Sequence, residues 1–374
     1  MTPAQLVLDR AGIDRLIGAL SARGYQVLGP TVRDGAIVYG EVAAAGDLPV
    51  GWKDEQAPAT YRLHHRDDEA LFGYVVGPQS PKTNLHPADV VVWKGERSGK
   101  AFRPLPLPTP PRFAFFGVRP CELAAIAVQD RVFLNGTRDT VYGGRRDGAF
   151  LVAVNCTEPG GTCFCTSMGT GPRATAGFDV VLTEVIDEAG HYFVAEAGSE
   201  GGSAVLAEAG AAGASTEQVE AADRLLTAAA GRMGRTLDTS GLRELLQENP
   251  QHPQWDEVAA RCLTCANCTQ VCPTCFCANV EDATDLGGDQ AVRTRRWDSC
   301  FNFEFSYMHG GPLRPSASAR YRQWMTHKLA SWYDQFGTSG CVGCGRCITW
   351  CPVGIDITAE AAAIRSSVEV VDAR

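Results

Sequence analysis

One cysteine spacing, C-x2-C-x2-C-x3-C-P, occurs twice in the chain. Three thiolates at intervals of three residues can surround one face of a cubane iron–sulfur cluster within a single short loop. The fourth cysteine precedes a proline, which suits a helix start because proline fixes φ and needs no backbone donor there. A fourth thiolate placed in this way points away from its own loop and ligates the cluster of the other run. The spacing therefore predicts two [4Fe–4S] clusters: cluster one, held by Cys262, Cys265, Cys268 and Cys351, and cluster two, held by Cys341, Cys344, Cys347 and Cys272.

Zinc is the main alternative ligand for cysteine-rich segments of this kind. Structural zinc sites use paired C-x2-C hooks, whereas this chain has three cysteines in series followed by C-P, and has the pattern twice. The small residues Ala266, Gly343 and Gly345 are expected to let backbone N–H groups approach the sulfurs. Such hydrogen bonds tune the potential of a cluster. The spacing and its repetition favour iron–sulfur clusters over zinc.

Four further cysteines lie in the N-terminal half at turn-like places: Cys121, Cys156, Cys163 and Cys165. Four is the number that one more [4Fe–4S] cluster needs, and loops at strand ends are where α/β folds place ligands. The hypothesis of a third cluster has two alternatives. The four residues could be small buried hydrophobic side chains, or two of them could form a redox-active dithiol.

Cys275, Cys277 and Cys300 are surplus to the two runs. They could join a metal site with a fourth ligand from elsewhere, line the path between clusters, or simply fill the core. The segment TCFC, which contains Cys275 and Cys277, repeats at residues 162–165 and hints at a role where the two halves of the chain meet. The sequence leaves these readings open.

The bulk composition excludes several classes of protein. A net charge of −9 gives no electrostatic support for binding nucleic acid. The N-terminus lacks the pattern of a signal peptide, and no window reaches the ~18 apolar residues of a membrane span. A cytoplasmic protein with no role in the membrane is therefore expected, and fifteen cysteines in a reducing compartment indicate metal binding or redox chemistry.

The elements that must position these cysteines divide the 374 residues into three parts and predict an α+β fold. Residues 1–195 read as an α/β domain with a helix at 4–23 and strands at 36–42, 71–76, 90–93, 113–117, 151–156 and 179–186. Residues 196–250 are rich in Ala, Gly, Glu and Leu and form a helical junction. Residues 251–374 read as a mostly helical, ferredoxin-like domain with two clusters. Six arginines between residues 293 and 322 could form a docking face for an acidic partner, a screen around anionic clusters, or an ordinary solvated surface.

Several segments together resemble a known family. The stretch 252–277, RRWDSC (295–300) and CVGCGRCITWCP (341–352) resemble the beta subunit of soluble NAD(P)-linked [NiFe] hydrogenases, the sulfhydrogenases. They equally resemble the iron–sulfur electron-transfer subunit of anaerobic sulfite reductase. GVRPCELAAI (117–126), the cysteine after LVAVN and TCFC (162–165) extend the resemblance to the N-terminal half and strengthen the hypothesis of a third cluster.

The resemblance implies an electron-transfer subunit of a cytoplasmic oxidoreductase complex, without a catalytic residue of its own. Its partners would be a flavoprotein subunit, which binds FAD and NAD(P)H, and a [NiFe] hydrogenase subunit or, alternatively, a sulfite reductase subunit. The residues agree, because the chain has neither a P-loop nor a dinucleotide fingerprint and no nucleophile–base arrangement. Two alternative readings come from other functional classes of protein. The chain could be a stand-alone thiol/disulfide redox enzyme that uses the N-terminal cysteines, or a protein-interaction scaffold whose fold is stabilised by zinc.

Overall fold

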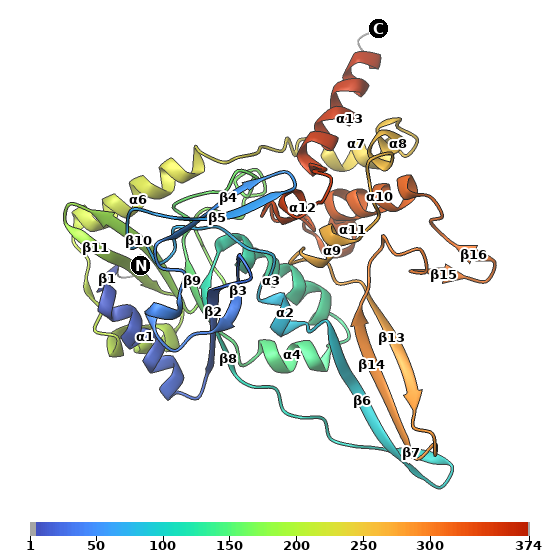
Figure 1. Ribbon diagram of the computed structural model, residues 1–374, viewed down its shortest axis with the longest axis horizontal. Helices are drawn as coiled ribbons and strands as arrows, with labels where there is room; N and C mark the ends of the chain where they lie inside the picture. Colours follow the sequence, from blue (N-terminus) through green and yellow to red (C-terminus); the bar gives the residue numbers. More distant parts are fainter. Residues whose placement is uncertain (1–4, 373–374) are drawn as a thin grey trace.

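The computed structural model describes residues 5–372 and confirms the predicted α+β class (Figure 1). The N-terminal region is built on an eight-stranded mixed sheet. Its four central strands run parallel to one another, and antiparallel strands complete both edges. In spatial order the strands are β12 (Ala212–Gly213), β1 (Leu6–Asp9), β11 (Gly190–Ala197), β10 (Val180–Asp187), β9 (Phe150–Val154), β8 (Phe113–Val118), β2 (Gln26–Arg33) and β3 (Ala36–Glu41).

Helices cover both faces of this sheet. Helices α1 (Arg10–Ala22) and α5 (Glu200–Glu208) share a core with Phe116 on one face, while α3 (Pro120–Phe133) and α4 (Thr140–Arg146) share a core with Phe115 on the other. Every residue of β8 and β9 is buried, as expected of parallel strands covered on both sides. Helix α6 (Thr216–Ala230) lies against β10 and β11, and the short helices η1 (Ala45–Asp47) and α2 (Lys82–Leu85) lie in the connections.

Two local predictions for the N-terminal region need correction. The helix predicted at 4–23 begins only at Arg10, because the side chain of Asp9 caps it by accepting from the Gly12 N–H, and the preceding residues form β1. Residues 71–76 are buried but form no strand. The backbone N–H groups of Leu71 and Phe72 donate to the Glu184 carboxylate instead of to a neighbouring strand.

The C-terminal region has a separate core formed by its helices and the helical junction. Short helices connected by loops carry the two cysteine runs, and a π-helical turn, η2, joins α10 to the short helix α11. The elements are α7 (Leu242–Glu248), α8 (Gln254–Ala259), α9 (Asn267–Gln270), α10 (Ala317–Thr326), η2 (His327–Ser331), α11 (Trp332–Phe336), α12 (Arg346–Thr349) and α13 (Ile357–Asp372).

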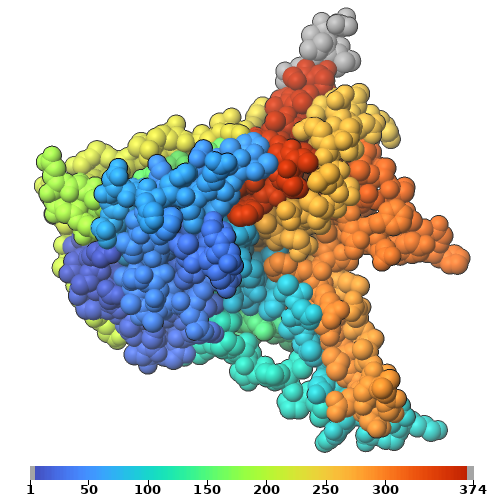
Figure 2. Space-filling model, in the orientation of Figure 1, coloured from blue at the N-terminus to red at the C-terminus, as the bar shows by residue number. Residues whose placement is uncertain are grey.

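The prediction that residues 251–374 are mostly helical missed two β-structures that stand away from the body of the molecule (Figure 2). The larger is a four-stranded arm in the order β13 (Ala278–Thr284), β14 (Gln290–Trp297), β6 (Asp89–Ser98) and β7 (Ala101–Pro104). Because β6 and β7 come from the first 195 residues, strands of the two predicted domains pair in one sheet here. The smaller is the hairpin of β15 (Tyr307–Met308) and β16 (Gly311–Pro312), and a further hairpin pairs β4 (Trp52–Ala57) with β5 (Thr60–His65).

Within residues 5–372, none of the helices combines the length and apolar character that crossing a membrane requires.

Candidate metal centres

The two cysteine runs fold in the same way. In each run the backbone has positive φ at two alternate positions, Thr264 and Ala266 in the first and Gly343 and Gly345 in the second, and a four-residue helix follows. In each, the backbone N–H two residues after the first cysteine donates to that cysteine's sulfur at 3.4 Å. Positive φ is unusual for Thr and Ala. The surrounding structure, rather than the preference of these residues, therefore imposes this loop shape on the first run.

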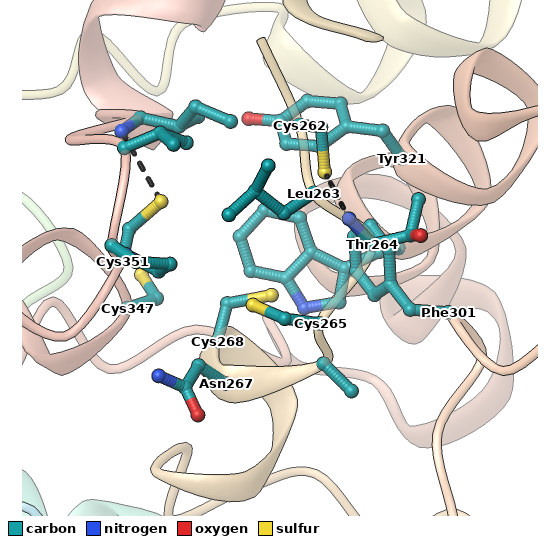
Figure 3. A pocket seen from close by; sticks show the side chains of 15 residues that line it. Cys262, Leu263, Thr264, Cys265, Asn267, Cys268, Phe301, Tyr321, Cys347 and Cys351 are labelled. Atoms are coloured by element: carbon teal, nitrogen blue, oxygen red, sulfur yellow. Dashed lines mark hydrogen bonds between the residues drawn. The ribbon is translucent and has the colours of Figure 1, made fainter.

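The four cysteines predicted for cluster one surround a single cavity (Figure 3). The side chains of Phe301, Tyr321 and Trp324 form its apolar wall. The backbone N–H of Ile355 donates to the sulfur of Cys351 at 3.3 Å, so the fourth cysteine also receives a hydrogen bond. The site lies at the surface, because Cys265 is exposed and the neighbouring Leu263 is 61% exposed.

The four cysteines predicted for cluster two are also close neighbours. Burial raises the pKa of Cys341 to about 12; Lys328 and the Gly343 N–H oppose this rise, and the nearby thiols Cys344 and Cys272 add to it. The pKa of the Cys347 thiol is raised by burial and by the same three cysteines. Cys272 comes from the other run, as the crossed ligation pattern requires.

The N-terminal cysteines gather around a second, smaller cavity. Cys121 follows β8 and Cys156 follows β9, at the carboxyl ends of adjacent parallel strands, where α/β folds bind ligands. The loop 162–165 brings Cys163 and Cys165 to the same place, and all four side chains are buried. The structure thus assembles the four residues of the hypothetical third site, although iron binding there stays a prediction.

Each of the two cavities is lined by five cysteines. Among residues 5–372, no three His, Cys, Asp or Glu side chains come together as the ligands of a single metal ion. At the cluster-one cavity the backbone N–H groups of Thr264 and Ile355 also donate to sulfurs, and cysteine thiolates with such hydrogen bonds are the donor set of a [4Fe–4S] cluster.

The second run packs backbone to backbone against the loop 162–165. The Phe164 N–H donates to the Gly343 carbonyl at 2.8 Å, and the Thr170 hydroxyl donates to the Val342 carbonyl at 2.6 Å. A Cβ on Gly345 would come within 2.4 Å of the Thr162 carbonyl oxygen. The predicted approach of a backbone N–H group to sulfur is found at Gly343, whose N–H donates to Cys341. Within residues 5–372, no such hydrogen bond is found at Gly345 or Ala266. The two glycines have a second role in the packing of the loops. They also let cluster two's loop touch the N-terminal cysteine site.

The surplus cysteines form two contacts rather than a third cavity. The Cys275 thiol lies next to that of Cys272, and the Cys277 thiol next to that of Cys300. The segment that contains Cys275 and Cys277 also meets the N-terminal half: Gln129 of α3 donates to the Pro273 carbonyl at 3.1 Å, and the Lys82 ammonium of α2 donates to the Cys275 carbonyl at 3.2 Å. The position agrees with the hint that this segment serves the junction of the two halves.

Three of the six arginines between residues 293 and 322 have acidic partners. Arg293 and Arg296 pair with acidic residues of the arm itself, and Arg295 pairs with Asp139. The other three donate to backbone carbonyls or to Ser306. The reading of all six as a docking face for an acidic partner is therefore weakened, because half of the charges are neutralised within the chain.

The paired runs and their cavities define an iron–sulfur protein of the dicluster type. A family model described as a 4Fe-4S dicluster domain matches residues 261–355. Sulfhydrogenase 2 subunit beta of Pyrococcus furiosus is 34% identical over 254 residues, which are 66% of this chain and 72% of that protein. The chain belongs to the family of sulfhydrogenase beta subunits, as the resemblance of its motifs predicts. No solved structure gives a significant match.

Proposed function

We propose that this chain is the iron–sulfur electron-transfer subunit of a cytoplasmic hydrogenase complex. It would pass electrons one at a time between a flavoprotein subunit, which binds FAD and NAD(P)H, and a [NiFe] hydrogenase subunit. Three [4Fe–4S] clusters would be held by the two ferredoxin runs and by the four N-terminal cysteines. When bound, each cluster supplies a one-electron redox couple, and the chain supplies ligands, burial and hydrogen bonds.

The observation that carries this proposal is the continuity of the three cysteine groups. Cys347, a ligand of cluster two in this proposal, also lines the cavity of cluster one. Cys344, another such ligand, also lines the N-terminal cavity. Cluster two would therefore lie between the other two, in a continuous row. The row ends at the surface beside Leu263, where a partner subunit could exchange electrons.

The rival readings have less support. The 34% sequence identity to a sulfhydrogenase subunit favours a hydrogenase complex over anaerobic sulfite reductase. A stand-alone thiol/disulfide enzyme needs a cysteine that its substrate can reach. The four N-terminal cysteines are each no more than 8% exposed, so the chain offers no such access at this site.

The proposal is tested in the whole complex with a Cys344→Ser variant. The flavoprotein should still reduce a dye with NAD(P)H, and the hydrogenase subunit should still reduce a dye with H₂, because neither reaction uses the conduit. Electron transfer from NAD(P)H to H₂ production should fall at least about tenfold. A variant that keeps the coupled activity of the unmodified complex would refute the proposed conduit.

A further inference from the structure

The two runs differ in what hydrogen-bonds to their fourth cysteine. Cys351, at the end of the second run, accepts from a neutral backbone group, the Ile355 N–H, at 3.3 Å. Cys272, at the end of the first run, accepts from the Lys328 ammonium at 3.2 Å and contacts the Thr274 hydroxyl at 3.1 Å. Two loops of the same shape therefore give their partner clusters different electrostatic surroundings.

The positive charge of Lys328 is buried without a carboxylate partner. Its side chain is 5% exposed, and its other hydrogen bonds go to the Thr274 hydroxyl and the Gly340 carbonyl, at 3.0 and 3.2 Å. Of the ion pairs found in residues 5–372, none includes Lys328. A buried cation needs a nearby anion, and the groups in reach are the cysteine thiolates. In an interior of low dielectric, this charge acts strongly on them.

The buried arginine near the same cluster is different. Arg346 lies beside Cys347 in sequence and near the Cys344 sulfur in space, but its guanidinium pairs with the Glu122 carboxylate at 2.6 Å. The pair is neutral as a whole, so it contributes much less to the potential than an unpaired cation does. Lys328 is thus an uncompensated positive charge in contact with a predicted ligand of cluster two.

The fold holds Lys328 in place from two sides. The residue lies in the π-helical turn η2, which follows α10, and the next residue in that turn, Leu329, is buried in the C-terminal core. The Lys328 carbonyl accepts from the Gly340 N–H at 2.8 Å, and Gly340 directly precedes Cys341. The ammonium is therefore fixed relative to both the first and the fourth ligand predicted for cluster two.

We propose that Lys328 raises the reduction potential of cluster two and so favours cluster two as the place where the conduit holds an electron. Reduction adds one negative charge near the thiolates, and a fixed cation stabilises the reduced form more than the oxidised form. Lys328 is a positioning residue that acts through Cys272. This inference rests on the proposed function, because it requires that clusters are present.

The experiment is a redox titration followed by EPR on the anaerobically purified chain and its Lys328→Met variant. Cys265→Ser identifies the signal of cluster one. The equilibrium constant for one-electron reduction of cluster two should fall at least tenfold in Lys328→Met, which corresponds to about 59 mV. Cluster one serves as the internal reference and should change much less. Lys328→Arg keeps the charge and should restore most of the loss.

Lys82→Met is the matched control. Lys82 is another buried lysine near these cysteines, but its ammonium donates to the Cys275 carbonyl and lies 3.7 Å from the Trp297 ring centroid rather than bonding to a sulfur. Its removal should lower the potential of cluster two less than Lys328→Met does. An equal effect of both variants would overturn the specific role of Lys328.

Other outcomes are equally decisive. An unchanged potential in Lys328→Met with full iron content would overturn this inference and leave the proposed function intact. If Lys328→Met, Lys328→Gln and Lys328→Arg all lose the irons of cluster two, Lys328 holds the cluster rather than tuning it, and the inference fails. Unmodified protein without iron and acid-labile sulfide would instead refute the proposed function itself.

Discussion

The Arg346 guanidinium lies 2.6 Å from the Glu122 carboxylate, and neither side chain is more than 2% exposed. Glu122 directly follows Cys121 of the N-terminal site, and Arg346 directly precedes Cys347 of the second run. The Tyr39 hydroxyl also donates to Glu122, at 3.0 Å. This buried ion pair therefore joins the two cysteine-bearing halves of the chain next to the ligands predicted for different clusters.

Glu122→Gln should destabilise the protein strongly, because it leaves the Arg346 charge buried without its partner. Loss of one partner of a buried pair costs about 3–5 kcal/mol. Denaturant unfolding of Glu122→Gln and of the unmodified protein under anaerobic conditions gives the difference in their free energies of unfolding. Asp334→Asn is the control: it breaks the exposed pair with Arg243 and should cost less than about 1 kcal/mol. Equal costs for the two variants would mean that the buried pair does not fasten the halves.

Gly345→Ala should disturb cluster two and the N-terminal site together. Its Cβ would meet the Thr162 carbonyl oxygen at 2.4 Å, so the loops that carry the two sites would have to separate. We expect a clear loss of iron and a lower thermal midpoint. Gly24→Ala separates this clash from backbone strain, since Gly24 has a similar φ of 77° but open space around the added Cβ. Gly24→Ala should lower the free energy of unfolding by only the ~1–2 kcal/mol that an alanine costs in the left-handed region. The variant should keep its iron.

Cys163→Ala should remove about four irons from each chain, because the cavity of the N-terminal site would lose a ligand. Iron quantitation on the purified variant checks this. Cys300→Ala is the comparison: Cys300 contacts Cys277 and lines neither cysteine cavity, so the iron count should stay unchanged. An unchanged count in Cys163→Ala would show that the N-terminal cysteines hold no cluster.

Acid should destabilise the protein through His86. Burial, followed by the charges of Arg295 and Lys82, lowers the pKa of His86 from its usual value to about 3. His86 binds a proton near pH 6.5 in the unfolded chain but only near pH 3 in the folded chain. The free energy of unfolding therefore falls as the pH falls from about 6.5 towards 3. His86→Phe should flatten the pH dependence of the unfolding free energy between pH 7 and 5. A slope identical to that of the unmodified protein would argue against this role.

The sequence predicts those features whose signal is local. The apolar run at 113–117 predicts a strand, which the structure shows as β8, and the cysteine spacing predicts both ferredoxin loops, whose crossed ligation stays a prediction. The arm strand β13 was missed because most of its residues are exposed and show no alternation. The segment 71–76 looks like a strand, but its backbone N–H groups find the side chain of Glu184, which lies more than 100 residues away.

The parts of the site that could not be predicted depend on contacts between distant segments. Lys328 is 56 residues from Cys272, and a lysine in a helical stretch gives no sign that it will be buried against a thiolate. Glu122 and Arg346 likewise look like ordinary charged residues until the fold brings them together. A weak signal did exist for this pair: each residue lies directly beside a cysteine of a predicted centre.

The central claim is that three groups of cysteines hold a continuous row of iron–sulfur clusters. Quantitation of iron, zinc and acid-labile sulfide in the anaerobically purified chain tests it most directly. The account predicts about twelve irons and about twelve sulfides per chain, from three clusters of four irons each. Protein that contains zinc, and neither iron nor acid-labile sulfide, would contradict it.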